Sequence, residues 1–196
     1  MCTFYIACVS ARGCYTPPMV VFKRKGLTED LIDGEVPGTI YGMSKSGWMD
    51  GELFSLWFRC HFLKYAPSDR PLLLLLDGHS SHYNPQVIRE AAQSGVILFC
   101  LPPNVTHVAQ PLDSTPFHSL KVHWDYACDQ YMSSHPGKVV TIYEFSHLFS
   151  QAWHQAMTPM TILSGFRATG VYPFNRQAIS IPGVEKDTAT PTAKVA

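Results

Sequence analysis

Asp77 is the first residue whose type and position could do chemistry. It ends the run PLLLLLD (71–77) and is followed by Gly-His-Ser-Ser-His. In open α/β sheets, sites lie in the crevice outside the carboxyl ends of strands. A carboxylate after an apolar strand is also costly to desolvate without a partner. Position alone therefore leaves two interpretations equally open: a functional Asp77, or an aspartate that only starts a turn.

Asp113 is the second candidate. It ends the segment LPPNVTHVAQPLD (101–113), which leaves a predicted strand, crosses a proline-rich loop and opens a predicted helix. Taken alone, Asp113 is best interpreted as the N-cap of that helix. Two carboxylates that converge beyond neighbouring strand ends would instead suit Mg²⁺, which prefers a few carboxylates together with waters and phosphate oxygens.

The polar residues after Asp77 leave alternatives open. His79 and His82 could orient a carboxylate or contact phosphate, but loop histidines without a ligand role are more common. Ser80 and Ser81 suggest a nucleophile, yet the sequence lacks the G-x-S-x-G elbow of hydrolases. An unrelated α/β hydrolase is kept only as a residual hypothesis.

The periodicity of apolar residues predicts an α/β fold that positions these side chains. An antiparallel early part precedes a strand, helix, strand unit over 71–101, which implies a right-handed parallel crossover. The predicted strands are 2–10, 18–23, a short one near 39–41, 72–77 and 96–101. The predicted helices begin at Asp50 and Asn84, cover 115–132 and 142–156, and end with a short one from Thr158-Pro159 to near Gly170.

Composition limits the class of protein. The 196 residues, 46% of them hydrophobic, are enough for one domain with a substantial core. The 15 basic and 15 acidic side chains cancel, so binding to DNA would have to be shared with another segment. The six cysteines form no C-x-x-C pair, which favours free thiols in an intracellular protein. The longest apolar run, 71–76, is far shorter than the roughly 20 residues of a membrane span.

Three stretches of the chain resemble a known family. Residues 72–124, with the DGHSSH turn and the LPPN–TH–QPLD segment, resemble the DDE superfamily endonuclease domain of pogo, Tigger and jerky-type transposases. GWMDGELFSLWF (47–58) is similar to the helix that precedes this region in the family, and GFRATGVYPFNR (165–176) is similar to its C-terminal signature.

The resemblance implies an RNase H-like mixed sheet flanked by helices and a Mg²⁺-dependent activity that cuts and rejoins DNA in the nucleus. By position, Asp77 matches the second catalytic, metal-binding acid of the family and Asp113 the third. Second-shell or DNA-contacting roles are then expected for His79, His82, Asn104 and His107. DNA is the expected partner, with self-association as a further expectation.

The chain departs from the family at its start. The first acid of the family lies on a central strand just upstream of the segment resembling 2–10, and this sequence begins with Met1-Cys2-Thr3. We therefore expect an incomplete metal site, which leaves open whether the chain is itself an enzyme. A domesticated, non-catalytic DNA-binding or protein-interaction module is the alternative, and DNA binding would rely on an upstream region. The expected domain covers 1–176, with a helical extension over 135–176 and a disordered tail over 177–196.

Overall fold

The strands form two small sheets. The structure, a computed structural model, describes residues 3–82, 84–102 and 105–179. In the first sheet, of order β1-β2-β3, β1 pairs with β2 antiparallel and β2 with β3 parallel. In the second, β4 and β5 run parallel, as predicted for the strand, helix, strand unit. The strands are β1 (Thr3–Val9), β2 (Tyr15–Phe22), β3 (Ile40–Met43), β4 (Leu72–Leu76) and β5 (Val96–Cys100).

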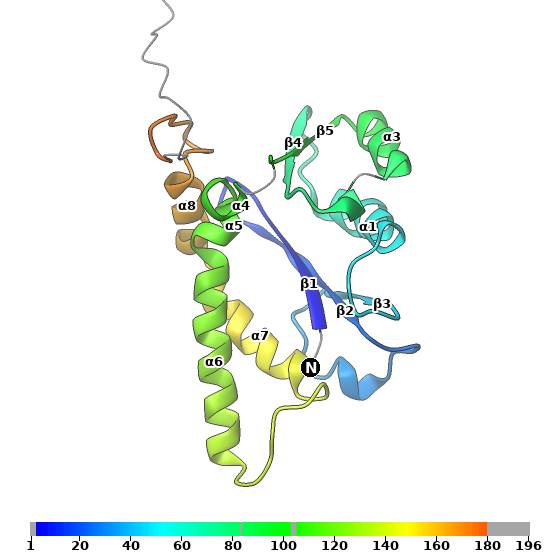
Figure 1. The fold of residues 1–196 in the computed structure, drawn as a ribbon, viewed down its shortest axis with the longest axis vertical. Helices are drawn as coiled ribbons and strands as arrows, with labels where there is room; N and C mark the ends of the chain where they lie inside the picture. Colours follow the sequence, from blue (N-terminus) through cyan, green and yellow to red (C-terminus); the bar gives the residue numbers. More distant parts are fainter. Residues whose placement is uncertain (1–2, 83, 103–104, 180–196) are drawn as a thin grey trace, which may run out of the picture.

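The helices pack on both faces of the first sheet. Figure 1 shows α6, α7 and α8 on one side of β1 and β2, and α1 on the other. The α-helices are α1 (Gly51–Trp57), α2 (Leu63–Tyr65), α3 (Pro85–Gln93), α4 (Thr106–Ala109), α5 (Pro111–Ser114), α6 (Pro116–Ser134), α7 (Phe145–Ala156) and α8 (Pro159–Ala168). Short 3₁₀ turns η1 (Glu29–Leu31) and η3 (Ser80–His82) and a π-helical segment η2 (Phe58–Phe62) complete the set.

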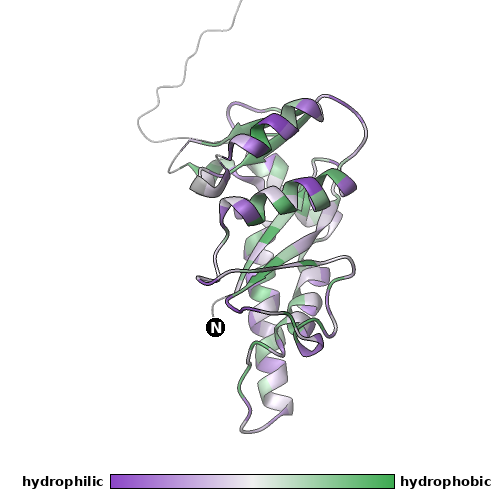
Figure 2. Ribbon diagram, turned by 90° about the vertical axis from the view of Figure 1, so that its right-hand side faces the viewer, coloured by the Kyte–Doolittle hydropathy of each residue, from purple (hydrophilic) through white to green (hydrophobic). Residues whose placement is uncertain are grey.

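Alternation along the strands builds two hydrophobic cores. Successive side chains of a strand point to opposite faces. In β2, Met19 and Val21 enter one core, whereas Val20 and Phe22 enter the other. The second core is completed mainly by α6 and α7, with Trp153 fully buried. In Figure 2 the strands at the centre are largely green, while the surrounding helices carry purple bands.

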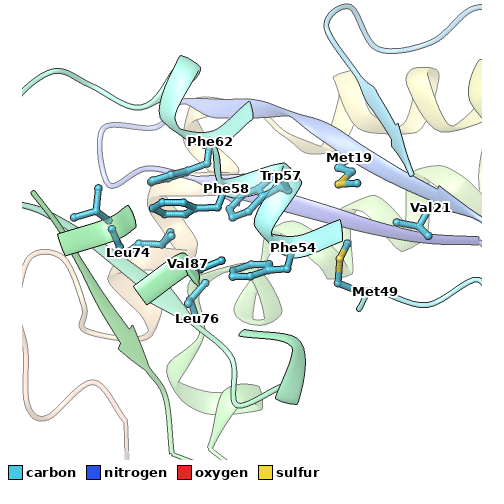
Figure 3. Close-up of a cluster of buried hydrophobic side chains, with 12 residues drawn as sticks. Met19, Val21, Met49, Phe54, Trp57, Phe58, Phe62, Leu74, Leu76 and Val87 are labelled. Atoms are coloured by element: carbon cyan, nitrogen blue, oxygen red, sulfur yellow. The ribbon is translucent and has the colours of Figure 1, made fainter. Parts of the chain in front are cut away.

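The first core joins the two sheets. Aromatic residues of the continuous helix formed by α1 and η2 stack on one another, with ring centroids 5.4 Å apart for Phe54 and Trp57 and 5.3 Å for Phe58 and Phe62. Figure 3 shows these rings between β2 on one side and Leu74 and Leu76 of β4 on the other. Among the described residues no strand pairing links β1 to β4, so side-chain packing connects the sheets.

Two expectations about the strands need correction. β2 begins before residue 18 and contains Pro17 and Pro18, which lie where the pairing with β1 shifts register. Prolines cannot donate to a ladder and are confined to edges and bulges of this kind. The continuous apolar run 72–76 is typical of a strand buried on both faces, but β4 is buried on one face only, because Leu73 is 55% exposed and lies beside the exposed Ile97 and Phe99 of β5.

The predicted helix starts at Asp50, Asn84 and Thr158 are confirmed, whereas α7 begins at Phe145 and not at 142. The Asp50 side chain accepts bonds from the amides of Glu52 and Leu53, at 3.1 and 2.9 Å, and Asn84 accepts one from Gln86 at 2.9 Å. Gly95 and Gly170, where two helices were expected to end, have φ values of +66° and +65°. Within the described ranges, no helix combines the length and the apolar character needed to cross a membrane.

Candidate metal-binding site

Asp77 immediately follows β4, in a turn that fixes its carboxylate. Oδ1 of Asp77 accepts a hydrogen bond from the His79 amide at 3.0 Å and one from Nδ1 of His82 at 2.9 Å. Nδ1 of His82 also lies 3.1 Å from the Asp77 carbonyl oxygen. The turn closes on itself through the amide of His82, which donates to the His79 carbonyl. The side chain of Asp77 nevertheless remains 42% exposed, so it is accessible to a ligand.

Helix α1 packs against this turn and holds it in place through contacts with His82 and Asn84. The His82 ring packs on Phe54, with the centroids 4.4 Å apart, and only 12% of the His82 side chain is exposed. Nδ2 of Asn84 donates to the Gly51 carbonyl at 2.9 Å. The first turn of α1 therefore holds both ends of the segment from His82 to Asn84, and through His82 it holds Asp77.

Asp113 lies in α5, a helix of four residues between β5 and α6. Its amide donates to the Gln110 carbonyl at 3.1 Å, and its side chain is exposed. The prediction that Asp113 is an N-cap is wrong, because α6 starts at Pro116 with Thr115 as its N-cap residue. The carboxylate of Asp113 is thus not used to cap that helix and is available for another role.

The two carboxylates differ in charge environment. The pKa of Asp77 is lowered, mainly by the hydrogen bond from His82. Burial acts in the opposite direction, and the His79 amide and the charges of the two imidazoles lower the pKa further. Burial raises the pKa of Asp113, and the negative charge of Asp77 raises it further, while His107 opposes both. The charges of Asp77 and His107 therefore both act on Asp113, although Asp77 lies before α3 and β5 in the sequence and Asp113 lies after them.

The remaining predicted residues fall in different surroundings. His79 is exposed, and its Nδ1 lies 2.8 Å from Oγ of Ser81, a buried residue held within the turn. His107 is exposed on α4. Asn104 lies outside the described residues. Among the predicted residues that the structure describes, His82 contacts the Asp77 carboxylate through its side chain and His79 contacts it through its backbone amide.

Tyr5 is a neighbour of the site that the sequence did not indicate. Burial, together with the charge of Asp113, raises the pKa of Tyr5 to about 12. Its ring packs edge-on against Phe117, in the first turn of α6, with the ring centroids 5.9 Å apart. Alternation along β1 places Tyr5 on the side of the second core. Which helix packs against Tyr5 on that side depends on tertiary packing, so the sequence alone does not indicate it.

Asp77 and Asp113 are the two candidate metal ligands of this region. Over the residues that the structure describes, no group of three or more His, Cys, Asp or Glu side chains is placed to hold a metal ion. Mg²⁺ is commonly held by one or two carboxylates, with waters and substrate phosphates in the other positions. Asp77 and Asp113 fit that pattern. A separate hollow of about 800 Å³ between α6 and α7 is lined by other residues, among them His123, His147 and His154.

Comparison with known proteins supports an endonuclease origin. Residues 1–166 match the family model described as DDE superfamily endonuclease. A protein of Cochliobolus lunatus named MFS-type transporter clz9 is 27% identical over 169 residues, which cover 84% of this chain and 18% of that protein. The chain thus spans less than a fifth of the length of this relative. No solved structure matches the chain.

Proposed function

Because this chain belongs to the family of DDE superfamily endonucleases, we propose that Asp77 and Asp113 are two of the acidic residues that hold divalent metal ions, Mg²⁺ in the cell, for cleavage and transfer of DNA strands. The observation that carries the proposal is that the negative charge of Asp77 raises the pKa of Asp113, although the two residues follow different elements, β4 and β5. The finer assignment to the pogo, Tigger and jerky type, with an RNase H-like fold and a nuclear location, rests on the motifs at 72–124 and 165–176.

The residues of the chain have distinct roles in this proposal. Oδ1 of Asp77 accepts both bonds of the turn, from His79 and His82, and these bonds fix the orientation in which the carboxylate would bind a ligand. Asp113 supplies the second carboxylate from α5. When bound, metal ions would supply charge stabilisation for phosphoryl transfer. His79 and His107 are exposed beside the carboxylates and can contact DNA phosphates.

A third acid completes the proposed site. In the family this acid lies on a central strand, and two features of the fold support such a strand here. β1 and β4 each have one edge without a strand partner among the described residues, and both pack on the first core. A strand between them would pair both edges and join the two sheets. DNA-binding affinity would come in part from a region upstream of this chain, in agreement with its balanced charge.

The test is a nicking assay on the longest natural polypeptide that contains these residues. We expect Asp77→Asn and Asp113→Asn each to abolish Mg²⁺-dependent nicking of duplex DNA, because each removes one negative ligand. Asp33→Asn, an exposed aspartate in the loop after η1, is the matched control and should leave nicking unchanged. Wild-type nicking in either site variant would overturn the assignment.

A second candidate function is a non-catalytic DNA-binding or protein-interaction module derived from such an enzyme. The observation that favours it is the exposed apolar face formed by Leu73, Ile97 and Phe99, since such a surface can bind another protein. In this case DNA binding would persist without a metal ion, and Asp77→Asn would leave the affinity unchanged. Metal-dependent nicking by the wild-type polypeptide would exclude this alternative.

A further inference from the structure

Helix α8 lies directly against the backbone of the turn that carries Asp113. Gly165, buried in the middle of α8, is the point of contact. A Cβ atom at this position would lie 2.3 Å from the carbonyl oxygen of Pro111 and 3.1 Å from Cδ of Pro116. These two prolines start α5 and α6, so the single glycine touches the chain on both sides of Asp113.

The opposite side of α8 is also blocked. Gly13 forms the tight turn between β1 and β2 with a φ of +83°. A Cβ there would meet Cγ of Leu163 and Cβ of Pro159, both at 3.3 Å. Helix α8 is therefore held between the β1–β2 turn on one side and α5 on the other, and it has little room to retreat from α5.

The turn around Asp113 has weak support of its own. Helices α4 and α5 have four residues each and lack a side-chain bond at their N-caps. Helices this short are not stable in isolation, because the free-energy cost of nucleating a helix exceeds the stabilisation from a single turn of hydrogen bonds. The position of Asp113 must therefore be determined by the elements that pack against α5.

We propose that Gly165 is a positioning residue, which sets the place of Asp113 relative to Asp77 by letting the α8 backbone touch Pro111. This inference rests on the proposed function of the two aspartates. It gives the C-terminal helix a role in the metal site, although no side chain of α8 is itself a ligand.

Replacement of Gly165 by alanine tests the contact with a single methyl group. Alanine favours helix formation over glycine, so any loss reflects the contact with Pro111 and not a weaker α8. Since real Cβ atoms do not approach a carbonyl oxygen to 2.3 Å, α5 must move. Loss of residues that orient a ligand typically weakens metal binding by about ten- to a hundredfold.

The experiment measures the full chain in two ways. Hydrogen exchange without metal should rise at the amides of Asp113 and Ser114, which both donate to Gln110, and stay unchanged at Ala127 in the middle of α6. Mn²⁺ binding, followed by electron paramagnetic resonance, should weaken by about tenfold or more. The control Gly26→Ala adds the same methyl where no atom lies within 4 Å and should change neither measurement.

Two more variants separate positioning from stability and from the proposed function. Ile162→Val removes one buried methyl group from the packing of α8 and adds no atom towards Pro111. If this variant changes hydrogen exchange and Mn²⁺ binding as much as Gly165→Ala does, the inference is overturned. If Gly165→Ala does not fold, Leu163→Ala, which loosens α8 against Gly13, must weaken Mn²⁺ binding, and unchanged binding overturns the inference. If Asp113→Asn binds Mn²⁺ like the wild type, the proposed function itself has failed, whatever Gly165→Ala does.

Discussion

At the scale of single residues, Asp77 and Asp113 contribute to stability with opposite signs. The folded pKa of Asp77 is lowered, so its ionised form stabilises the fold above the ordinary pKa of an aspartate, and that contribution is lost as pH falls through the folded pKa. The folded pKa of Asp113 is raised, so its ionised form opposes folding at neutral pH, and protonation relieves this cost.

Neutralising each aspartate should therefore shift the unfolding midpoint in opposite directions. At pH 7 without metal, Asp77→Asn lowers the midpoint, because the bonds from His79 and His82 lose their charged acceptor. Asp113→Asn raises it, since a partly desolvated charge that is repelled by Asp77 is removed. Thermal unfolding followed by circular dichroism measures both. A shift of the same sign in the two variants would contradict the electrostatic account, and the exposed Asp33→Asn should change little.

The sequence predicted the two carboxylates better than their surroundings. Asp77 and Asp113 follow from local motifs, and the bond from His82 to Asp77 spans only five residues. The contacts of Tyr5 and Gly165 with the Asp113 turn join segments far apart in the chain. Such contacts depend on which helix covers which face of the sheet, and no local pattern in the sequence specifies that.

At the scale of elements, the helix over 51–65 buries only part of the face that its spacing indicates. Helical spacing groups Leu53, Leu56, Trp57, Cys60 and Leu63 on one face. Trp57 is buried, but Leu56 is 39% exposed and Cys60 is exposed as well. The wider π-helical turn at 58–62 changes the angle between successive residues and brings Phe58 and Phe62 inwards. A 3.6-residue period carried through this segment therefore loses register.

Two alanine substitutions test which face of this helix is buried. Phe58→Ala should lower the free energy of unfolding by about 3–5 kcal/mol, because the fully buried ring leaves a cavity between the two sheets. Leu56→Ala, two residues away, should cost about 1 kcal/mol or less, since its side chain is partly solvated. Urea denaturation gives both values. Equal losses would show that the helix is rotated relative to this structure.

The prediction of strands shows a similar limit. A run of five leucines is typical of a strand buried on both faces, but only one face of β4 is covered by other parts of the fold. Periodicity reports how apolar a strand is, but whether a helix covers each face depends on the rest of the fold. Because prolines are disfavoured inside strands, Pro17 and Pro18 led to a predicted strand that starts at residue 18. The bulge that accommodates them depends on pairing with β1, which the local sequence does not show.

At the scale of the whole molecule, two sheets are joined by one apolar core. Among the described residues, backbone pairing links β1 to β2 and β4 to β5 but not β1 to β4. The unpaired edges of β1 and β4 leave amides and carbonyls open to pairing with other chains. The exposed face formed by Leu73, Ile97 and Phe99 adds apolar surface next to one of these edges.

We therefore expect the isolated 196-residue chain to unfold with weak cooperativity and to aggregate. The midpoint should fall and light scattering should rise as the protein concentration increases, because intermolecular pairing at open edges competes with refolding. Scans at several concentrations measure both effects. A sharp, reversible transition independent of concentration would show that the two edges are protected in the monomer.

The first core, which connects the two sheets, has a temperature dependence that differs from that of the sheets themselves. Burial of Phe54, Trp57 and Phe58 is driven by the hydrophobic effect, which weakens on cooling, whereas the backbone ladders within each sheet do not depend on it in the same way. Asp77 is attached to one sheet, and Asp113 is held by α8 beside the other. Cold should therefore loosen the spacing of the two carboxylates before it disturbs the secondary structure that carries them.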